Sequence, residues 1–154
     1  VLERQGVDWR NTNTLVLKQC LPMAKKLGFH IPQTMDGDEI YIENCAGLDR
    51  LKGQNHIVIG KADNPQDPYI DMLGSAALTK SHTMSKKSGN KKHIEGIRGR
   101  HSLYAFEDDT LWGLQSQQMR QSIEQAVARA RTLRNNVVVY VFADYPVRDA
   151  ILIK

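Results

Sequence analysis

Short apolar runs recur along the chain and predict the strands of a sheet. The run Thr14–Cys20 is long and apolar enough for a buried strand, as are His56–Gly60 and Val137–Phe142. Residues 39–43 alternate apolar and polar side chains with the two-residue period of a strand. Ala150–Ile153 is a candidate for a last strand.

Helical patterns separate these runs. Pro22 opens a predicted helix over 23–27, where its missing donor costs nothing, and Gly28 ends that helix. Residues 67–79 carry apolar side chains at helical spacing. The clearest helix is predicted over 116–134, where apolar residues form one stripe of period 3.6. This stripe comprises Met119, Ile123, Ala126, Val127, Ala130 and Leu133.

Turn-forming and polar segments interrupt the predicted elements. The pair Asp36-Gly37 centres a predicted turn over 33–38. Residues 81–99 are rich in Ser, Gly and Lys and are predicted to form a basic loop. Residues 101–106 and 110–114 flank a Glu-Asp-Asp turn and are predicted to pair as a β-hairpin.

The alternation of strands with helices defines the expected fold class. It is typical of an α/β domain with a mainly parallel central sheet and helices on both faces. Ligands of such sheets bind at the carboxyl ends of the strands. The chain has 154 residues, which is the usual length of one domain.

Composition narrows the class of protein. Hydrophobic residues make up 41% of the chain and charged residues 25%, as in ordinary globular proteins. No apolar run approaches the ~18–20 residues of a membrane span, and nothing resembles a signal peptide, so we expect a cytoplasmic protein that contacts no membrane. Because the chain begins at Val1 and not at Met, we expect a fragment of a longer protein.

The cysteines and histidines suggest no metal site. Cys20 and Cys45 are too few for a disulfide scaffold. Cys20 ends an apolar run, so we expect a reduced and buried thiol there. No Cys or His spacing fits zinc, and we assign no residue to a metal.

The net charge of +4 is concentrated in one segment. Residues 80–100 hold seven basic residues against one acidic residue, which gives this segment a local net charge of +6. Such a segment suits a polyanion, although a solubilising loop has the same composition. The candidate nucleic-acid contacts are Lys86, Lys87, Lys91, Lys92, Arg98 and Arg100.

The segment Gln125–Arg131 is the candidate for phosphate chemistry. Gln125 and Arg129 are one helical turn apart and share a face, and an arginine held there can stabilise negative charge on a phosphate. A solvated helix face has the same pattern. Because the chain lacks a Gly-x-x-x-x-Gly-Lys-Ser/Thr loop, we expect it to supply half of a nucleotide site and not a whole one.

Three segments in order give the chain a family resemblance over roughly residues 13–143. Leu15–Leu17 is an apolar strand, Gly47-Leu48-Asp49 precedes the strand-like run 56–59, and Gln125-x-x-Ala-Arg-x-Arg131 precedes another. In this order they resemble the second RecA-like domain of superfamily 2 helicases and translocases. The second segment is similar to the family's fifth motif and the third to its sixth.

The resemblance implies a fold and a set of roles. Residues 1–154 would form one RecA-like domain, with 81–114 as an insertion made of the basic loop and the hairpin. Arg129 and Arg131 would reach a nucleotide, with Arg129 as the arginine finger, and Gln125 would order the same face. Asp49, with Gly47, would couple the nucleotide to the nucleic acid. ATP with Mg would be bound mainly by a first RecA-like domain upstream, which this chain lacks, and the partner would be DNA or RNA.

The sixth-motif segment departs from the family at Ala128, where the family usually has Gly. On a regular helix, Arg131 also lies about 200° around the axis from Arg129. Both arginines can therefore face one nucleotide only if the helix begins late or is distorted at this point.

Two other functions fit parts of the sequence. A metal-independent ribonuclease would use His93 or His101 as general base, with Arg98 and Arg100 on the phosphate. A non-catalytic nucleic-acid-binding module would use residues 80–101 alone.

Overall fold

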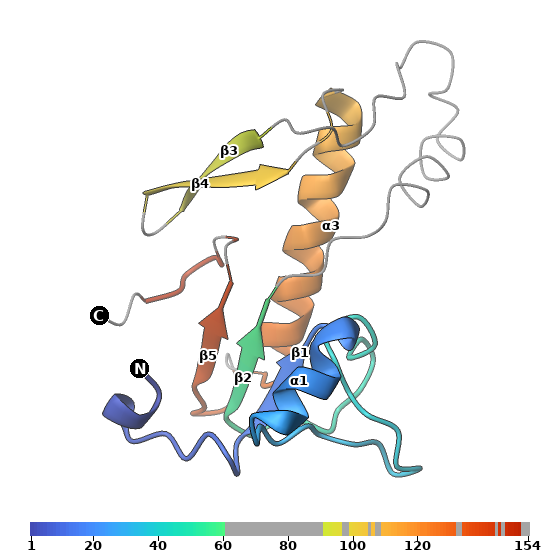
Figure 1. Ribbon diagram of the computed structural model, residues 1–154, viewed down its shortest axis with the longest axis vertical. Coiled ribbons are helices and arrows are strands. Elements are labelled where there is room, and N and C mark those ends of the chain that lie inside the picture. Colours follow the sequence, from blue (N-terminus) through green and yellow to red (C-terminus); the bar gives the residue numbers. More distant parts are fainter. Residues whose placement is uncertain are drawn as a thin grey trace. The chain divides into compact units, whose positions relative to one another are not determined.

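The structure is a computed structural model of the 154-residue chain (Figure 1). It describes residues 1–60, 91–96, 99–104, 106, 109–131, 134–143, 145 and 147–151. Its elements, in chain order, are the 3₁₀-helix Glu3–Gln5, β1 (Asn13–Val16), the 3₁₀-helix Lys18–Cys20, α1 (Leu21–Lys26), β2 (His56–Ile59), β3 (Lys91–Gly96), β4 (Gly99–Tyr104), α3 (Asp109–Ala128) and β5 (Val139–Phe142).

The contacts divide the chain into two compact units. The first comprises Val1–Ala62 and Ser122–Asp144, and the second comprises Asp63–Gln121 and Tyr145–Lys154. The first unit contains a three-stranded parallel sheet in the order β1-β2-β5. Together with α1 and α3, this sheet confirms the predicted α/β class at the level of a small parallel sheet with helices.

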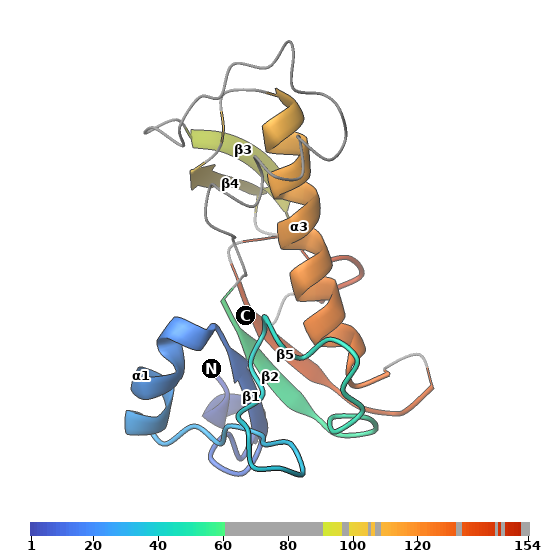
Figure 2. The same ribbon diagram turned by 90° about the vertical axis from the view of Figure 1, so that its right-hand side faces the viewer.

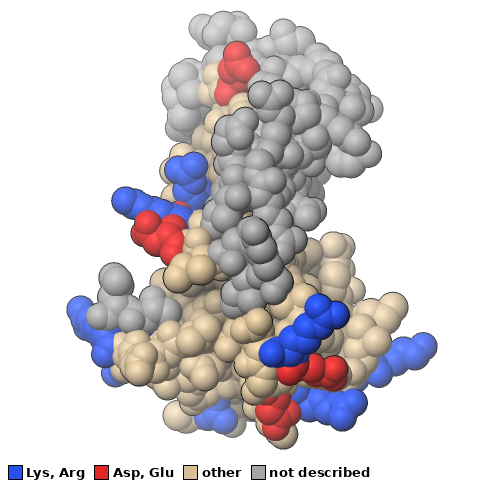
Figure 3. Space-filling model, turned by 90° about the vertical axis from the view of Figure 1, so that its left-hand side faces the viewer, with Lys and Arg blue, Asp and Glu red and all other residues tan. Residues whose placement is uncertain are grey.

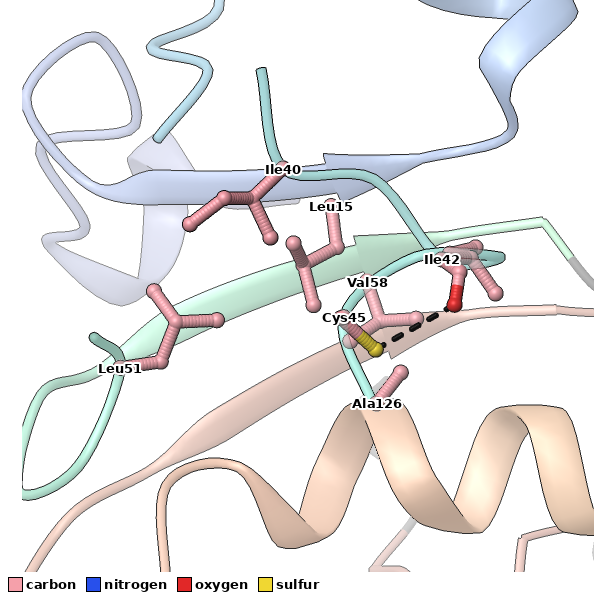
Figure 4. Packing of buried hydrophobic residues seen from close by; sticks show 7 residues of the cluster. All are labelled: Leu15, Ile40, Ile42, Cys45, Leu51, Val58 and Ala126. Carbon is pink, nitrogen blue, oxygen red and sulfur yellow. Dashed lines mark hydrogen bonds between the residues drawn. The ribbon is translucent and has the colours of Figure 1, made fainter. Parts of the chain in front are cut away.

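Both faces of the sheet are covered. Neighbouring residues of β1 point to opposite faces of the sheet, and each packs against a different helix. Leu15 packs with Val58 and with Ala126 of α3 on one face (Figure 4). Val16 packs with Leu21 and other residues of α1 on the opposite face. Figure 2 shows α1 and the end of α3 on either side of the strands, as predicted.

The short helix and the turn near the N-terminus follow their local signals. Pro22 lies in the first turn of α1, and Gly28 follows the helix with a positive φ of 85°. In the predicted turn, Thr34 N–H donates to Asp38 O at 2.8 Å and Gly37 has φ 89°. The helix begins two residues before the predicted start and ends one residue before the predicted end, so proline and glycine located it but did not fix its bounds.

Residues 39–43 form no assigned strand, contrary to the prediction, although their alternation is real. Ile40 and Ile42 are buried on the α3 face of the sheet (Figure 4), whereas Tyr41 packs on the α1 face. Ile42 N–H bonds to Val16 O at 2.9 Å, but Tyr41 N–H donates to the Asn44 side chain at 2.7 Å. Because this bond draws the chain into a turn, the segment lines β1 without building a ladder.

The first strand ends earlier than predicted. β1 stops at Val16, and a 3₁₀ turn over Lys18–Cys20 leads into α1. Cys20 is therefore exposed and not buried, and the free thiol in the core belongs to Cys45. The prediction was wrong because it extended the strand through polar residues that begin the turn.

The predicted hairpin is misplaced. Residues 110–114 belong to α3, and the hairpin forms between β3 and β4, from Lys91 opposite Tyr104 to Gly96 opposite Gly99. Part of the predicted loop 81–99 is therefore strand β3. The helix begins earlier because its buried stripe extends N-terminally with a spacing of four residues; this stripe comprises Leu111, Gln115, Met119 and Ile123.

The second unit has a small core of its own. Phe106 and Leu111 are fully buried and pack with Leu114. Phe106 N–H donates to the buried Gln115 side chain at 3.3 Å.

The predicted helix 67–79 lies outside the described residues, and in the predicted last strand Ala150 and Ile151 are irregular. None of the helices in the described residues is both long and apolar enough to cross a membrane.

Candidate arginine site at the amino edge of the sheet

Two loops lie side by side where β2 and β5 begin. Gly53 N–H, in the loop before β2, donates to Ala130 O at 3.1 Å, and Val138 N–H, just before β5, donates to the Asn55 side chain at 2.8 Å. Because the strands are parallel, both loops lie at the amino edge of the sheet. The candidate segments therefore do not lie at the carboxyl edge, where ligands of such sheets were expected.

The two segments that carry the family resemblance meet at this edge. Arg131 Nη2 lies 2.8 Å from Asp49 Oδ1 and 3.0 Å from Oδ2. The Arg131 side chain is 36% exposed and the Asp49 side chain is 64% exposed, so water screens the pair. The ion pair therefore holds Arg131 against Asp49 but adds little to the stability of the fold.

A double-mutant cycle measures this ion pair. Asp49→Ala, Arg131→Ala and the double variant are expected to give a coupling free energy of about 0.2–1 kcal/mol in urea unfolding, because the pair is largely solvated. Added salt should reduce the coupling. Zero coupling at low salt would mean that the two side chains do not interact in solution.

Arg129 contacts the same turn. Its Nη1 donates to Leu48 O at 3.4 Å and its Nε donates to Gln125 O at 3.3 Å. Gln125 therefore orders Arg129 through its backbone carbonyl, one helical turn earlier. A guanidinium has five N–H donors, so these two long bonds leave capacity for a phosphate.

The end of α3 explains how both arginines reach one turn. The helix stops at Ala128, and Arg131 adopts a left-handed φ of 52°. Asn135 closes the turn by donating from its side chain to Ala130 O at 3.2 Å and Arg131 O at 3.1 Å. The 200° separation expected on a regular helix therefore does not apply, and the predicted helix to residue 134 is wrong.

Gly47 adopts a backbone conformation that favours glycine. Its φ is +78°, and a Cβ at this position would meet no atom within 4 Å. Gly47→Ala is therefore expected to cost only backbone strain, about 1–2 kcal/mol of unfolding free energy in urea titration. Gly47→Asn should cost less, because asparagine tolerates this region. Equal stability of Gly47→Ala and the parent chain would contradict this.

His56 is a buried residue of the site that the sequence reading did not single out. Its side chain is fully buried, and its Nε2 lies 2.9 Å from Ala126 O. Since a carbonyl only accepts, Nε2 carries the hydrogen. Nδ1 has no hydrogen-bond partner among the described residues. Burial lowers the pKa of His56, and the backbone groups of Ala126 and Gln54 oppose the shift.

This shift predicts a pH dependence of stability. The unfolded chain takes up a proton on His56 near pH 6.5, whereas the folded chain resists it until lower pH. The free energy of unfolding should therefore fall as pH drops below about 6.5, by at most about 1.4 kcal/mol per pH unit from this group. Urea titrations at several pH values measure the slope. An unchanged slope in His56→Gln would rule out His56 as its source.

The buried Cys45 is not a nucleophile. Burial raises the pKa of the Cys45 thiol, and the nearby Arg129 guanidinium opposes this only in part. Sγ lies 3.2 Å from Ile42 O, to which the thiol donates (Figure 4). The thiol is therefore protonated at neutral pH, and it contributes packing to the core cluster against which Leu48 packs.

The predicted nucleic-acid contacts are only partly described. Lys91 and Lys92 lie on β3 and Arg100 lies on β4 opposite Glu95, while Lys86, Lys87 and Arg98 lie outside the described residues. On the face in Figure 3, the described Lys and Arg side chains lie among Asp and Glu side chains. The predicted residues whose side-chain contacts the structure describes are therefore those of the arginine site.

The hairpin also holds the histidines of the ribonuclease hypothesis. His93 pairs with Ser102 and His101 pairs with Ile94, so the two histidines occupy neighbouring register positions.

In the part of the chain that the structure describes, no three His, Cys, Asp or Glu residues gather where they could hold a metal ion. Comparisons with protein-family models, curated proteins and solved structures found no match.

Proposed function

We propose that the chain is the second, RecA-like motor domain of an ATP-dependent nucleic-acid helicase or translocase. The observation that carries the proposal is the meeting of its two motif-like segments: Asp49 holds Arg131, and the Leu48 carbonyl accepts from Arg129. These segments are far apart in the sequence, and the resemblance requires them to work together. A parallel α/β sheet with helices on both faces is compatible with this class.

The contacts suggest different roles for the two arginines. Asp49 takes two hydrogen bonds from Arg131, so Arg131 links the two loops. Arg129 makes only two long contacts to carbonyl oxygens, and these are easily exchanged for a phosphate oxygen. Arg129 is therefore the arginine finger of the proposal, and Asp49, beside Gly47, couples it to the nucleic acid.

The nucleotide would be held elsewhere. ATP and Mg would bind mainly to a first motor domain upstream, and Arg129 would reach the transferred phosphate from this chain. A side chain donated to another domain's ligand need not lie at the carboxyl ends of its own strands. The amino-edge position of the arginines is therefore compatible with a half-site.

A reconstitution experiment tests the proposal. The 154-residue chain alone should neither bind ATP tightly nor hydrolyse it. The longer protein that carries a first motor domain should hydrolyse ATP, faster with DNA or RNA present. Cleavage of RNA in EDTA by the chain alone would replace the proposal with the ribonuclease. Salt-dependent nucleic-acid binding without ATP hydrolysis by the longer protein would replace it with the binding module.

A further inference from the structure

We propose that His56 is a positioning residue that sets where α3 ends and thereby holds Arg129 and Arg131 against the Leu48–Asp49 turn. The inference rests on the proposed function for its catalytic consequence. Its structural part, the end point of the helix, stands on contacts within the chain.

The last carbonyl groups of a helix lack partners within the helix. At the end of α3, the Ala126 carbonyl accepts from the buried His56 side chain at 2.9 Å. Ala130 N–H would bond to this carbonyl if the helix continued, but it bonds to Val127 O at 3.3 Å. His56 thus ties to β2 the carbonyl that the next helical turn would use.

The bonds that follow depend on this end point. The Ala130 carbonyl is left to accept from Gly53 N–H at 3.1 Å, which ties the end of α3 to the loop before β2. Arg131 can then take its left-handed φ of 52° and meet Asp49. His56 is the first residue of β2, so the sheet itself fixes the donor.

A histidine that only packs in the core leads to a different expectation. If His56 only filled space, leucine would replace it without moving the arginines. If its donor sets the helix end, loss of the donor removes the tie that holds Ala126 O and lets α3 wind on, with Ala130 N–H bonding to Ala126 O. A continued helix would place Arg131 about 200° from Arg129 and away from Asp49.

Two variants separate these readings. His56→Leu fills the site without a donor, and His56→Gln keeps an N–H that can reach Ala126 O. In the longer protein with its first motor domain, His56→Leu should lower kcat for ATP hydrolysis about 10-fold or more, with KM for ATP within about 2-fold. His56→Gln should stay within about 3-fold of the parent kcat, because it restores the donor.

Hydrogen exchange on the 154-residue chain gives a readout that needs no activity. In His56→Leu, the Gly53 amide should exchange about 10-fold faster or more, since its acceptor on Ala130 moves, whereas His56→Gln should match the parent. Unchanged Gly53 exchange in His56→Leu would overturn the inference, as would equal changes in both variants. Absence of ATP hydrolysis in the parent longer protein would remove the proposed function and leave the exchange result to decide the helix end.

Discussion

Replacing Arg129 by alanine is expected to lower kcat for nucleic-acid-stimulated ATP hydrolysis by about 10³-fold or more in the two-domain protein that the proposed function requires. An arginine finger acts on charge that develops in the transition state, so its loss falls on kcat more than on KM. The measurement is steady-state ATP hydrolysis with saturating nucleic acid. Folding should be little changed, because Arg129 makes only two long hydrogen bonds in the chain.

Matched variants make this prediction specific. Arg120→Ala removes an exposed arginine from the same helix and should leave hydrolysis unchanged. Arg129→Lys keeps the charge but loses the guanidinium fork, so it should recover only part of the rate. Hydrolysis by Arg129→Ala at the parent rate would remove Arg129 from the reaction and leave it as part of a solvated helix face.

Replacing Leu15 by alanine is expected to destabilise the chain by about 2–5 kcal/mol. Leu15 is fully buried at the centre of the cluster that joins β1, β2 and α3 (Figure 4). Truncation removes apolar contacts and leaves a cavity in the core cluster between the sheet and α3. The free energy of unfolding from urea titration measures the loss.

Met35 supplies the control for this core substitution. It lies in the turn before residues 39–43 and is 94% exposed, so Met35→Ala should change stability by no more than about 0.5 kcal/mol. Similar losses for Met35→Ala and Leu15→Ala would contradict the packing described for the first unit. A loss of the Leu15 variant below about 1 kcal/mol would do the same.

Much of the first unit could be predicted from local sequence signals. The strands β2 and β5 were predicted from continuous apolar runs, and α1 was predicted from Pro22 and Gly28. These signals suffice because each element is short, and because proline and glycine act on the backbone directly. The prediction that β5 is buried was wrong, since Val139–Val141 are only partly buried and Phe142 is exposed. The segment 39–43 was harder, since whether an alternating run joins a ladder depends on a side chain such as Asn44.

The bounds of α3 were missed at both ends for tertiary reasons. Residues 110–114 look strand-like locally, and only the longer stripe from Leu111 to Ile123 assigns them to a helix. At the other end, the apolar stripe runs past Ala128, but Asn135 and Gly53 bind the backbone of the following turn. Such partners are distant or irregular in sequence, so periodicity does not reveal them.

The candidate site was predicted in part. The sequence named Asp49, Arg129 and Arg131, because their segments resemble known motifs. It did not predict the ion pair between Asp49 and Arg131, which requires the helix to end before Arg129. It also passed over His56, although a histidine at the start of an apolar run is a signal that a buried polar group needs a partner.

The most direct test of the arginine site is a structure of the longer protein bound to ADP, Mg and a metal-fluoride mimic of the transferred phosphate. The Arg129 guanidinium is expected to lie about 3 Å from the mimic, having left the Leu48 carbonyl, while Arg131 remains bound to Asp49. If Arg129 is still bound to the Leu48 and Gln125 carbonyls and other residues contact the mimic, Arg129 is not the arginine finger.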